Sequence, residues 1–300
     1  MIAFQFPGQG SQFAGMGQTL AATFPEARAI FDRADEALGF SLSTLCFEGP
    51  EDALKLTENT QPAILTASIA AWEVLKTRLQ PAFVAGHSLG EYSALVAAGA
   101  LSFEDAVRTV RKRGQYMQEA VPAGVGAMAA LRTSEEAVQP ILDQAAEGEV
   151  LTAANFNAPD QVVIAGHAGA VDRALKLARG IKLQVSAPFH CPLMQPAQER
   201  LAADLAQIAF HDLALPLVNN VRAELVTTGA AARQGLIDQV PNSVRWTATV
   251  RLLAEQGVTT FVEVGPKTVL SGLLKKIDAT RTGLKFGEAA DLEAILEATA

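Results

Sequence analysis

AFVAGHSLG, residues 82–90, joins a short apolar strand at 82–85 to a helix that closes at Gly99. The GxSxG motif at 86–90 is typical of a sharp strand-to-helix turn that lifts a serine hydroxyl clear of a sheet. Its two glycines let the backbone pass close to a strained Ser88, and the helix that follows points its positive end at the site. We predict that Ser88 is a nucleophile; the alternative is a structural turn in which Ser88 only caps the helix.

Strands and helices alternate on both sides of this turn, which predicts an α/β fold with a parallel sheet. The strands and helices that we assign to this sheet layer follow from short apolar runs and from longer segments bounded by proline, glycine or a serine cap. The expected strands are 2–6, 82–85, 215–218 and 259–264, and the expected helices are 61–79, 102–120 and 193–208.

The pattern changes between residues 124 and 187, where the predicted order is β-α-β-β-α-β. This order is that of a ferredoxin-like unit. We therefore expect a small inserted domain at 124–187 and a large domain formed by 1–123 and 188–300, with the active cleft between them. The expected strands of the insertion are 127–131, 150–155, 162–165 and 181–185, and its helices are 134–145 and 168–178.

Composition excludes several classes of protein. The chain has 300 residues and a mass of 31.6 kDa, of which 49% are hydrophobic and 19% charged, so intrinsic disorder is excluded. Cys46 and Cys191 cannot form a disulfide framework, and no Cys/His spacing indicates a metal site. A net charge of −8 disfavours nucleic acid as a partner. Without a targeting or membrane-spanning segment, we expect a cytoplasmic protein that does not bind membranes.

A serine nucleophile needs a base, and the chain has only four histidines: His87, His167, His190 and His211. His87 adjoins Ser88 and should point away from it. His190 lies in the proline-bounded loop 186–192, where the chain passes from the insertion back to the large domain, and a nearby helix N-terminus would keep its ring neutral. His190 is the best candidate base, although a histidine bonded within a loop core is an equally good interpretation.

An ordinary α/β-hydrolase has its triad in the order Ser, Asp or Glu, then a late His. No histidine follows His211 in this chain, and no HGGG-type loop precedes the GxSxG turn. A plain esterase is therefore disfavoured. The loop FPGQGSQ at 6–12 follows the first strand and could supply oxyanion donors instead, or could be only a glycine-rich turn.

Several motifs together make the chain resemble the malonyl-CoA:acyl-carrier-protein transacylases, acyltransferases of fatty-acid and polyketide synthesis. The resemblance implies a hydrolase-like large domain with a parallel sheet and an inserted ferredoxin-like small domain, in agreement with the segmentation above. The matching motifs are FPGQGSQ at 6–12, GHSLGEYSAL at 86–95, KRGQYMQEAVP at 112–122, NFNAPDQVVIAGH at 155–167, SAPFHCPLM at 186–194 and VEVGP at 262–266.

The resemblance also implies roles for individual residues. Ser88 becomes acylated, His190 acts as base and acid, and the backbone amide of Leu89 with Gln9 forms the oxyanion hole. Arg113 binds the free carboxylate of the substrate, since a planar guanidinium can hold a carboxylate through two hydrogen bonds. Helical periodicity alone does not select Arg113, because Arg111 flanks the inner face of the same helix on its other side.

Three further residues complete the implied site. Asn155 matches an asparagine near the active site, and Gln239 matches a residue whose backbone carbonyl orients the histidine in place of a triad acid. Phe189 would narrow the acyl pocket against branched groups or serve only in packing. The segment 239–246 has Pro241 and Ser243 where the family has proline immediately before Val-x-Trp, which predicts a different backbone path there.

The predicted function is transfer of a malonyl group from CoA to the phosphopantetheine thiol of an acyl carrier protein, with no metal or other cofactor. A serine thioesterase or esterase, or a non-catalytic module that binds acyl carriers, are the alternatives. A chain that starts at Met1 suggests a free-standing enzyme, and we expect a monomer. The carrier could dock on a late basic stretch that could equally be ordinary solvated surface: Lys267, Lys275, Lys276, Arg281 and Lys285.

Overall fold

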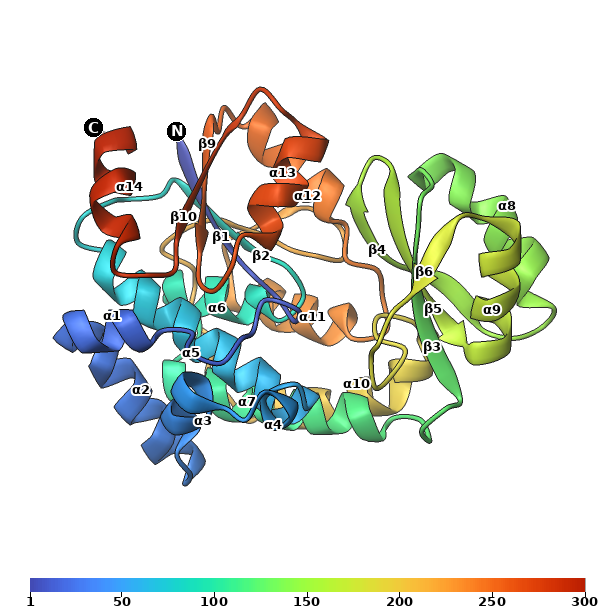
Figure 1. Cartoon of the computed structure of the whole chain (residues 1–300), viewed down its shortest axis with the longest axis horizontal. Helices are drawn as coiled ribbons and strands as arrows, with labels where there is room; N and C mark the ends of the chain where they lie inside the picture. The colour runs from blue at the N-terminus through green and yellow to red at the C-terminus, as the bar shows by residue number, and fades with distance from the viewer. Residues whose placement is uncertain (300) are drawn as a thin grey trace.

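The computed structural model describes residues 1–299 and contains two β-sheets (Figure 1). The larger sheet has six strands, all parallel to their neighbours except β8, which pairs antiparallel with β7 at one edge. This confirms the predicted α/β class and adds one antiparallel strand. In sheet order, its strands are β10 (Thr282–Phe286), β9 (Thr260–Val264), β1 (Ile2–Phe6), β2 (Phe83–Gly86), β7 (Leu217–Val218) and β8 (Leu225–Val226).

Helices cover both faces of the larger sheet, which explains why its central strands β1 and β9 are buried at every position but the first. Phe4 and Phe6 of β1 pack into the core beneath α2, α5 and α7, whereas Ala3 faces the core formed with α12 and α13. The helices of this layer are α1 (Gln18–Thr23), α2 (Pro25–Leu38), α3 (Leu42–Glu48), α4 (Glu51–Leu54), α5 (Thr57–Leu75), α6 (Gly90–Ala97), α7 (Phe103–Glu119), α10 (Gln195–Leu205), α11 (Gly229–Gln239), α12 (Trp246–Glu255), α13 (Val269–Ile277) and α14 (Asp291–Thr299).

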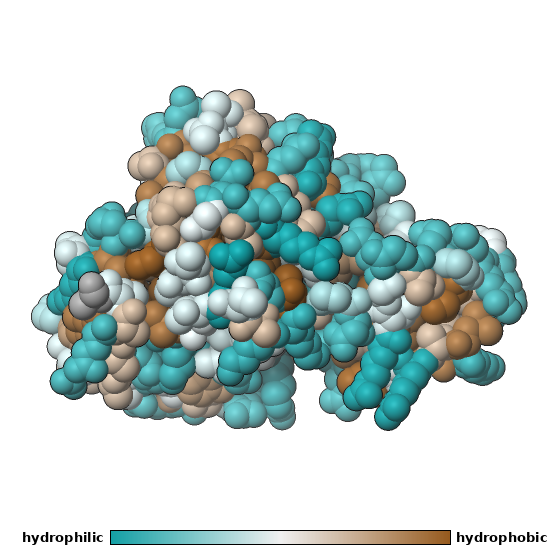
Figure 2. All heavy atoms as spheres, turned by 90° about the horizontal axis from the view of Figure 1, so that it is seen from above, coloured by the Kyte–Doolittle hydropathy of each residue, from teal (hydrophilic) through white to brown (hydrophobic). Residues whose placement is uncertain are grey.

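The smaller sheet is antiparallel and lies on the right in Figure 1. Its order is β4 (Leu151–Ala158), β5 (Gln161–His167), β3 (Gly126–Leu131) and β6 (Gly180–Lys182). Helices α8 (Glu135–Ala146) and α9 (Ala168–Leu177) pack on one face, with Ala129, Leu131 and Ile164 in the core between. All six elements lie within 124–187, the segment predicted as an insertion. Seen from above, a notch separates this part from the rest (Figure 2).

Backbone hydrogen bonds connect the two sheet layers. The Phe156 amide donates to the Val244 carbonyl at 2.9 Å, and the Val244 amide donates to the Ala154 carbonyl at 2.9 Å. The segment before α12 therefore lies beside β4 like a short extra strand. Lys276 on α13 also reaches across, and its Nζ donates to Gln161 Oε1 at 3.0 Å.

Several predicted elements differ from the structure at their ends; the strand predicted at 215–218, for example, is only Leu217–Val218, and β4 extends to Ala158 instead of 155. Helix α5 begins at Thr57 rather than 61, so Pro62 lies inside the helix instead of at its start. Strand β6 ends at Lys182 rather than 185, because the last ladder bond to β3 joins the Leu183 amide to the Met128 carbonyl and the chain then turns toward the larger layer. The helix expected at 193–208 is a 3₁₀ turn at Pro192–Met194 followed by α10.

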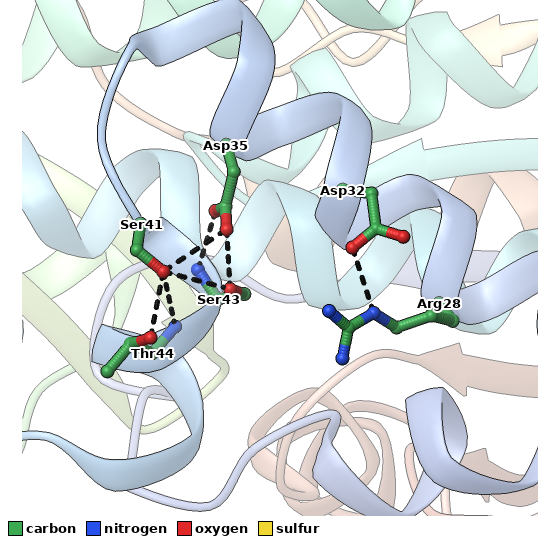
Figure 3. A network of polar contacts seen from close by, with 6 residues as sticks. All are labelled: Arg28, Asp32, Asp35, Ser41, Ser43 and Thr44. Carbon is green, nitrogen blue, oxygen red and sulfur yellow. Dashed lines mark hydrogen bonds and ion pairs between the residues drawn. The ribbon is translucent and has the colours of Figure 1, made fainter.

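A polar network fixes the corner between α2 and α3 (Figure 3). The Asp35 carboxylate accepts hydrogen bonds from the Ser43 amide at 2.8 Å and the Ser43 hydroxyl at 2.6 Å. Ser41 caps α3 by accepting from the Thr44 amide. None of the helices in the described 299 residues is long and apolar enough to cross a membrane.

Candidate active site

Ser88 lies at the turn between β2 and α6 with φ of 52°, a left-handed backbone conformation that is rare for a serine. Close packing explains the flanking glycines. A Cβ on Gly86 would lie 1.9 Å from the Gly90 carbonyl carbon, and one on Gly90 would lie 2.0 Å from the Phe6 carbonyl oxygen. The predicted strand-turn-helix geometry is therefore present, and the loop after β1 packs directly against it.

Asn220 braces this turn from the segment after β7. Its side-chain Oδ1 accepts a hydrogen bond from the Ser88 amide at 2.6 Å, and its Nδ2 donates to the Gly86 carbonyl at 2.6 Å. The side chain is fully buried. Asn220 was not predicted from the sequence, although two consecutive asparagines directly after a predicted strand are a signal that could have identified it.

His190 meets Ser88 across the cleft, with 2.7 Å between His190 Nε2 and Ser88 Oγ. His190 Nδ1 lies 3.0 Å from the backbone carbonyl oxygen of Gln239. Because a carbonyl can only accept, Nδ1 carries the proton and Nε2 is left to accept from the serine hydroxyl. The structure thus brings together the serine and the histidine selected from the sequence, which lie 102 residues apart.

The His190 ring is neutral, as predicted. Burial, followed by the positive charge of Arg113, lowers the pKa of His190 to about 3. At neutral pH the ring is therefore unprotonated and able to accept a proton.

Gln239, at the end of α11, is placed by both its backbone and its side chain. Besides the carbonyl that accepts from His190, its Nε2 donates to the Ser88 carbonyl at 3.0 Å and its Oε1 accepts from Arg113 at 2.8 Å. The altered path expected from Pro241 and Ser243 does not move this carbonyl away from the histidine. Instead, the Ser243 hydroxyl donates to the Ala153 carbonyl at 2.6 Å and ties this segment to β4.

Arg113 projects from α7 into the buried end of the cleft, with 2% of its surface exposed. Its Nη1 donates to Gln61 Oε1 at 2.8 Å, and its Nη2 donates to Ser88 Oγ at 3.1 Å. Its Nε has no hydrogen-bond partner in the described part of the chain. Burial lowers the pKa of Arg113, but a guanidinium stays charged at any pH used with proteins.

The other basic residues of α7 point elsewhere. Arg111 lies over the Phe40 ring at 4.5 Å and donates to Asn59, while Lys112 pairs with Asp204 at 2.9 Å. Arg108 donates to the Ala37 carbonyl. Tertiary packing thus places Arg113 beside Ser88, a choice that helical periodicity left open.

A cleft of about 190 Å³ surrounds these groups between the two sheet layers. Gln9, Leu89 and Phe189 line it from the larger layer, and Asn155 lines it from β4. His87 also reaches the cleft but turns its Nε2 to Asn157 Oδ1 at 2.8 Å, away from the serine hydroxyl. All eight site residues named from the sequence therefore lie at this cleft or, for Gln239, directly behind it.

Two more buried polar residues at the site were not anticipated. Gln61 stands one position before Pro62 and holds Arg113 from α5. Glu91, in the first turn of α6, is 1% exposed and accepts from Gln239 Nε2 at 2.7 Å. The motif GHSLGE contains Glu91, but nothing in its spacing indicates that this charged side chain is buried.

The arrangement can carry out acyl transfer through a serine ester. It offers a nucleophile, a neutral base within hydrogen-bond distance, a helix N-terminus at the nucleophile and a buried cation beside it. Within residues 1–299, no group of three or more His, Cys, Asp or Glu side chains is placed to hold a metal ion.

Comparison with known proteins agrees with this chemistry. Residues 3–284 match the acyl transferase domain family. The chain is 51% identical over 286 residues to the malonyl CoA-acyl carrier protein transacylase of Bacillus subtilis, covering 92% of this chain and 90% of that protein. It is 48% identical to the protein of the same name from Escherichia coli K12, with 99% of both chains covered.

Solved structures match over the same length. An acyl carrier protein S-malonyltransferase from Vibrio cholerae has a TM-score of 0.96 at 45% identity, covering 98% of this chain and 99% of that one. A malonyl-transacylase in complex with its type II PKS acyl-carrier protein has a TM-score of 0.96 at 43% identity, with 99% of both chains covered.

Proposed function

This chain belongs to the acyl transferase domain family, and from that premise we propose that it transfers malonyl from CoA to the phosphopantetheine thiol of an acyl carrier protein. The observation that carries the proposal is the position of Ser88 Oγ. It lies 2.7 Å from a neutral imidazole and 3.1 Å from a buried guanidinium. A malonyl ester formed on that oxygen would have its free carboxylate one methylene beyond the reacting carbonyl, within reach of the guanidinium.

In the first half-reaction, Ser88 Oγ attacks the thioester carbonyl carbon while His190 Nε2 takes the hydroxyl proton. The carbonyl oxygen becomes an oxyanion, which the Leu89 amide at the N-terminal end of α6 and Gln9, both lining the cleft, would stabilise. The carbon–sulfur bond then breaks, and the sulfur of CoA leaves with the proton from His190. The product is malonyl-Ser88.

The second half-reaction reverses these steps with a different thiol. His190 takes the proton from the phosphopantetheine thiol of the carrier, and the sulfur attacks the ester carbonyl. When the ester bond breaks, Ser88 Oγ regains a proton from His190. The two substrates and these side chains account for every bond made and broken, so we propose that the reaction needs no metal or redox cofactor.

Arg113 would select acyl groups that bear a carboxylate. An acetyl group has no carboxylate to bring to the buried guanidinium, whereas the malonyl carboxylate can pair with it through two hydrogen bonds. Phe189, next to the base and lining the cleft, is proposed to limit the width of the acyl pocket, and Asn155 to close it from the β4 side. Both roles rest on position alone.

Intact-mass analysis tests the proposal directly. On mixing the protein with malonyl-CoA, we expect a mass increase of one malonyl group on the wild-type chain and none on Ser88→Ala. Addition of phosphopantetheinylated carrier protein should then remove the adduct from the enzyme and place it on the carrier.

Other outcomes would identify the alternative functions. An adduct that disappears at the same rate with and without carrier protein would indicate a thioesterase or esterase that delivers the acyl group to water. A chain that binds carrier protein but never forms an adduct would indicate a non-catalytic binding module.

A second groove, lined by other residues than the active cleft, offers basic side chains to an acidic partner. It has a volume of about 500 Å³, and its basic residues are Arg132, Arg179 and Lys276. Ile181 of β6 lines this groove, and Leu183, whose amide extends the ladder to the Met128 carbonyl just after β6, lines the active cleft. Since alternate residues of an extended segment share one face, the two spaces lie along the same face of the smaller sheet. We propose that the acidic carrier and the CoA phosphates approach here.

Charge reversal tests this docking surface. The Lys275→Glu/Lys276→Glu double variant, at the end of α13, should slow transfer to the carrier roughly tenfold at low salt, because basic residues steer an acidic partner. The effect should shrink at high salt. Lys285→Glu is the matched control, since Lys285 is already paired with Asp291 at 2.9 Å. Unchanged transfer kinetics at low salt in the double variant would exclude this surface.

A further inference from the structure

The mechanism leaves one buried acid at the site without a role. Glu91 lies in the first turn of α6, three residues after Ser88, and is 1% exposed. Its Oε2 accepts hydrogen bonds from Gln239 Nε2 at 2.7 Å and from the Asn220 amide at 3.2 Å. A carboxylate this deeply buried is costly unless a cation compensates it.

The compensating cation is Arg113, reached through one amide group. Arg113 Nη2 donates to Gln239 Oε1 at 2.8 Å, and Gln239 Nε2 passes the connection on to Glu91. The amide is thus oriented with its oxygen toward the cation and its nitrogen toward the acid. The same Gln239 provides the carbonyl that accepts from His190, so the acid is connected to both functional side chains.

A malonyl carboxylate would bring a second anion to the same cation. Both anions lie in a buried region where charges are weakly screened, and one guanidinium cannot compensate two of them fully. We propose that Glu91 is the counter-charge of Arg113 while the cleft is empty, and that Glu91 takes up a proton when the malonyl carboxylate binds. Glu91 is then a positioning residue that acts through Gln239, and this inference rests on the function proposed above.

The groups around Glu91 allow it to gain a proton when malonyl binds. The charged or titratable neighbours are Arg113 from α7 and Tyr92 from its own helix; α11 contributes Gln239 and Gly235, and the segment after β7 contributes Asn220, all uncharged. Burial raises the pKa of Glu91 to about 7, although hydrogen bonds and Arg113 act in the opposite direction. Burial raises the pKa of Tyr92 as well, so its hydroxyl stays neutral over the same pH range.

The sign of the pH dependence follows. Below pH 7, Glu91 is protonated and Arg113 is free to bind the substrate carboxylate. Above pH 7, Glu91 is charged, and malonyl binding then requires either proton uptake by Glu91 or two anions beside one cation, so the preference for malonyl falls as pH rises. If malonyl raises the pKa of Glu91 by one unit, the preference falls about tenfold between pH 6 and pH 9.

Binding to a chain that cannot react tests the proposal. In the Ser88→Ala variant, calorimetry would give the dissociation constants of malonyl-CoA and acetyl-CoA from pH 6 to pH 9. Their ratio cancels the titration of the phosphates that both ligands share. We expect the preference for malonyl to fall about tenfold over this range in Ser88→Ala, and to stay constant in Ser88→Ala/Glu91→Gln. Glutamine keeps an oxygen that can accept from Gln239 and Asn220 but carries no charge.

Two controls complete the experiment. Glu104→Gln in the Ser88→Ala background makes the same change at a carboxylate near the solvent-facing start of α7, paired with Arg33, and should leave the pH dependence intact. The second control needs no substitution at Glu91. Calorimetry at pH 8 in buffers of different ionisation enthalpy measures how many protons the Ser88→Ala protein takes up when it binds each ligand. We expect uptake with malonyl-CoA and none with acetyl-CoA.

The possible outcomes distinguish failure of the role proposed for Glu91 from failure of the Arg113 carboxylate site. A preference for malonyl that is independent of pH in Ser88→Ala, or whose pH dependence is unchanged by the added Glu91→Gln substitution, would overturn the role of Glu91 alone. Absence of proton uptake would do the same. Equal binding of malonyl-CoA and acetyl-CoA at pH 6 would overturn the Arg113 carboxylate site itself, and the role of Glu91 with it.

Discussion

Replacing His190 with asparagine is expected to lower the rate of Ser88 malonylation by about 10⁴-fold, because the serine loses its only base within hydrogen-bond distance. Asparagine is the informative replacement. His190 has φ of 59°, a left-handed conformation that asparagine tolerates better than most residues. The rate of adduct formation from malonyl-CoA, followed by intact mass in a quenched-flow series, measures the effect.

The control for this variant is His211→Asn, at an exposed histidine outside the cleft, which should leave the rate unchanged. A pH profile gives an independent readout. Since burial and Arg113 hold the pKa of His190 near 3, wild-type kcat/KM for malonylation should not decline between pH 7 and pH 5 through protonation of the base. A decline with an apparent pKa between 6 and 7 would contradict the lowered pKa of His190, whereas a His190→Asn rate within tenfold of wild type would contradict its assignment as the base.

The sequence predicted the parts of this site that depend on local backbone geometry. Ser88 could be identified because a strained serine between a strand and a helix needs nearby glycines on both sides, and the sequence itself shows those glycines. His190 could be narrowed down because the chain offers few histidines and one of them stands in a rigid proline-bounded loop. The α/β layering followed in the same way from apolar runs whose lengths differ between strands and helices.

Other parts of the site depend on tertiary contacts that no sequence pattern indicates. The group that orients His190 is a backbone carbonyl, which every residue possesses, so only the resemblance to a family pointed to Gln239. Asn220 braces Ser88 from 132 residues away and Gln61 holds Arg113 from α5; each is one polar residue in an apolar surrounding. Burial of Glu91 likewise results from tertiary packing of α6 against α7 and α11.

Helix α7 shows both what periodicity can predict and what depends on tertiary packing. The periodicity of α7 correctly separates an inner from an outer face, but Arg111 and Arg113 flank that inner face on opposite sides. Which of them reaches the nucleophile depends on how α7 crosses α5, with Gly114 packed so closely that a Cβ there would lie 2.7 Å from Glu58 Cα. That crossing brings Arg113 to Ser88 and leaves Arg111 against Phe40.

Replacing Arg113 with alanine is expected to reduce kcat/KM for malonyl-CoA by roughly a thousandfold, since losing a buried, hydrogen-bonded charge partner costs about 4 kcal/mol. The value for acetyl-CoA should change by less than tenfold, because acetyl carries no carboxylate that could pair with Arg113. Initial rates of acyl-enzyme formation with the two thioesters, compared as a ratio, measure the selectivity and cancel any general loss of folded protein.

Two matched variants separate charge from geometry. Arg111→Ala removes the guanidinium two positions away on the same helix and should leave the malonyl-to-acetyl ratio unchanged. Arg113→Lys keeps a positive charge but has no planar fork, so it should restore only part of the malonyl preference. If Arg113→Ala lowered malonyl and acetyl transfer equally, the guanidinium would be supporting Ser88 and Gln239 rather than the substrate. The selectivity for a charged acyl group would then have to come from another part of the cleft, where Gln9 and Asn155 offer only neutral hydrogen-bonding groups.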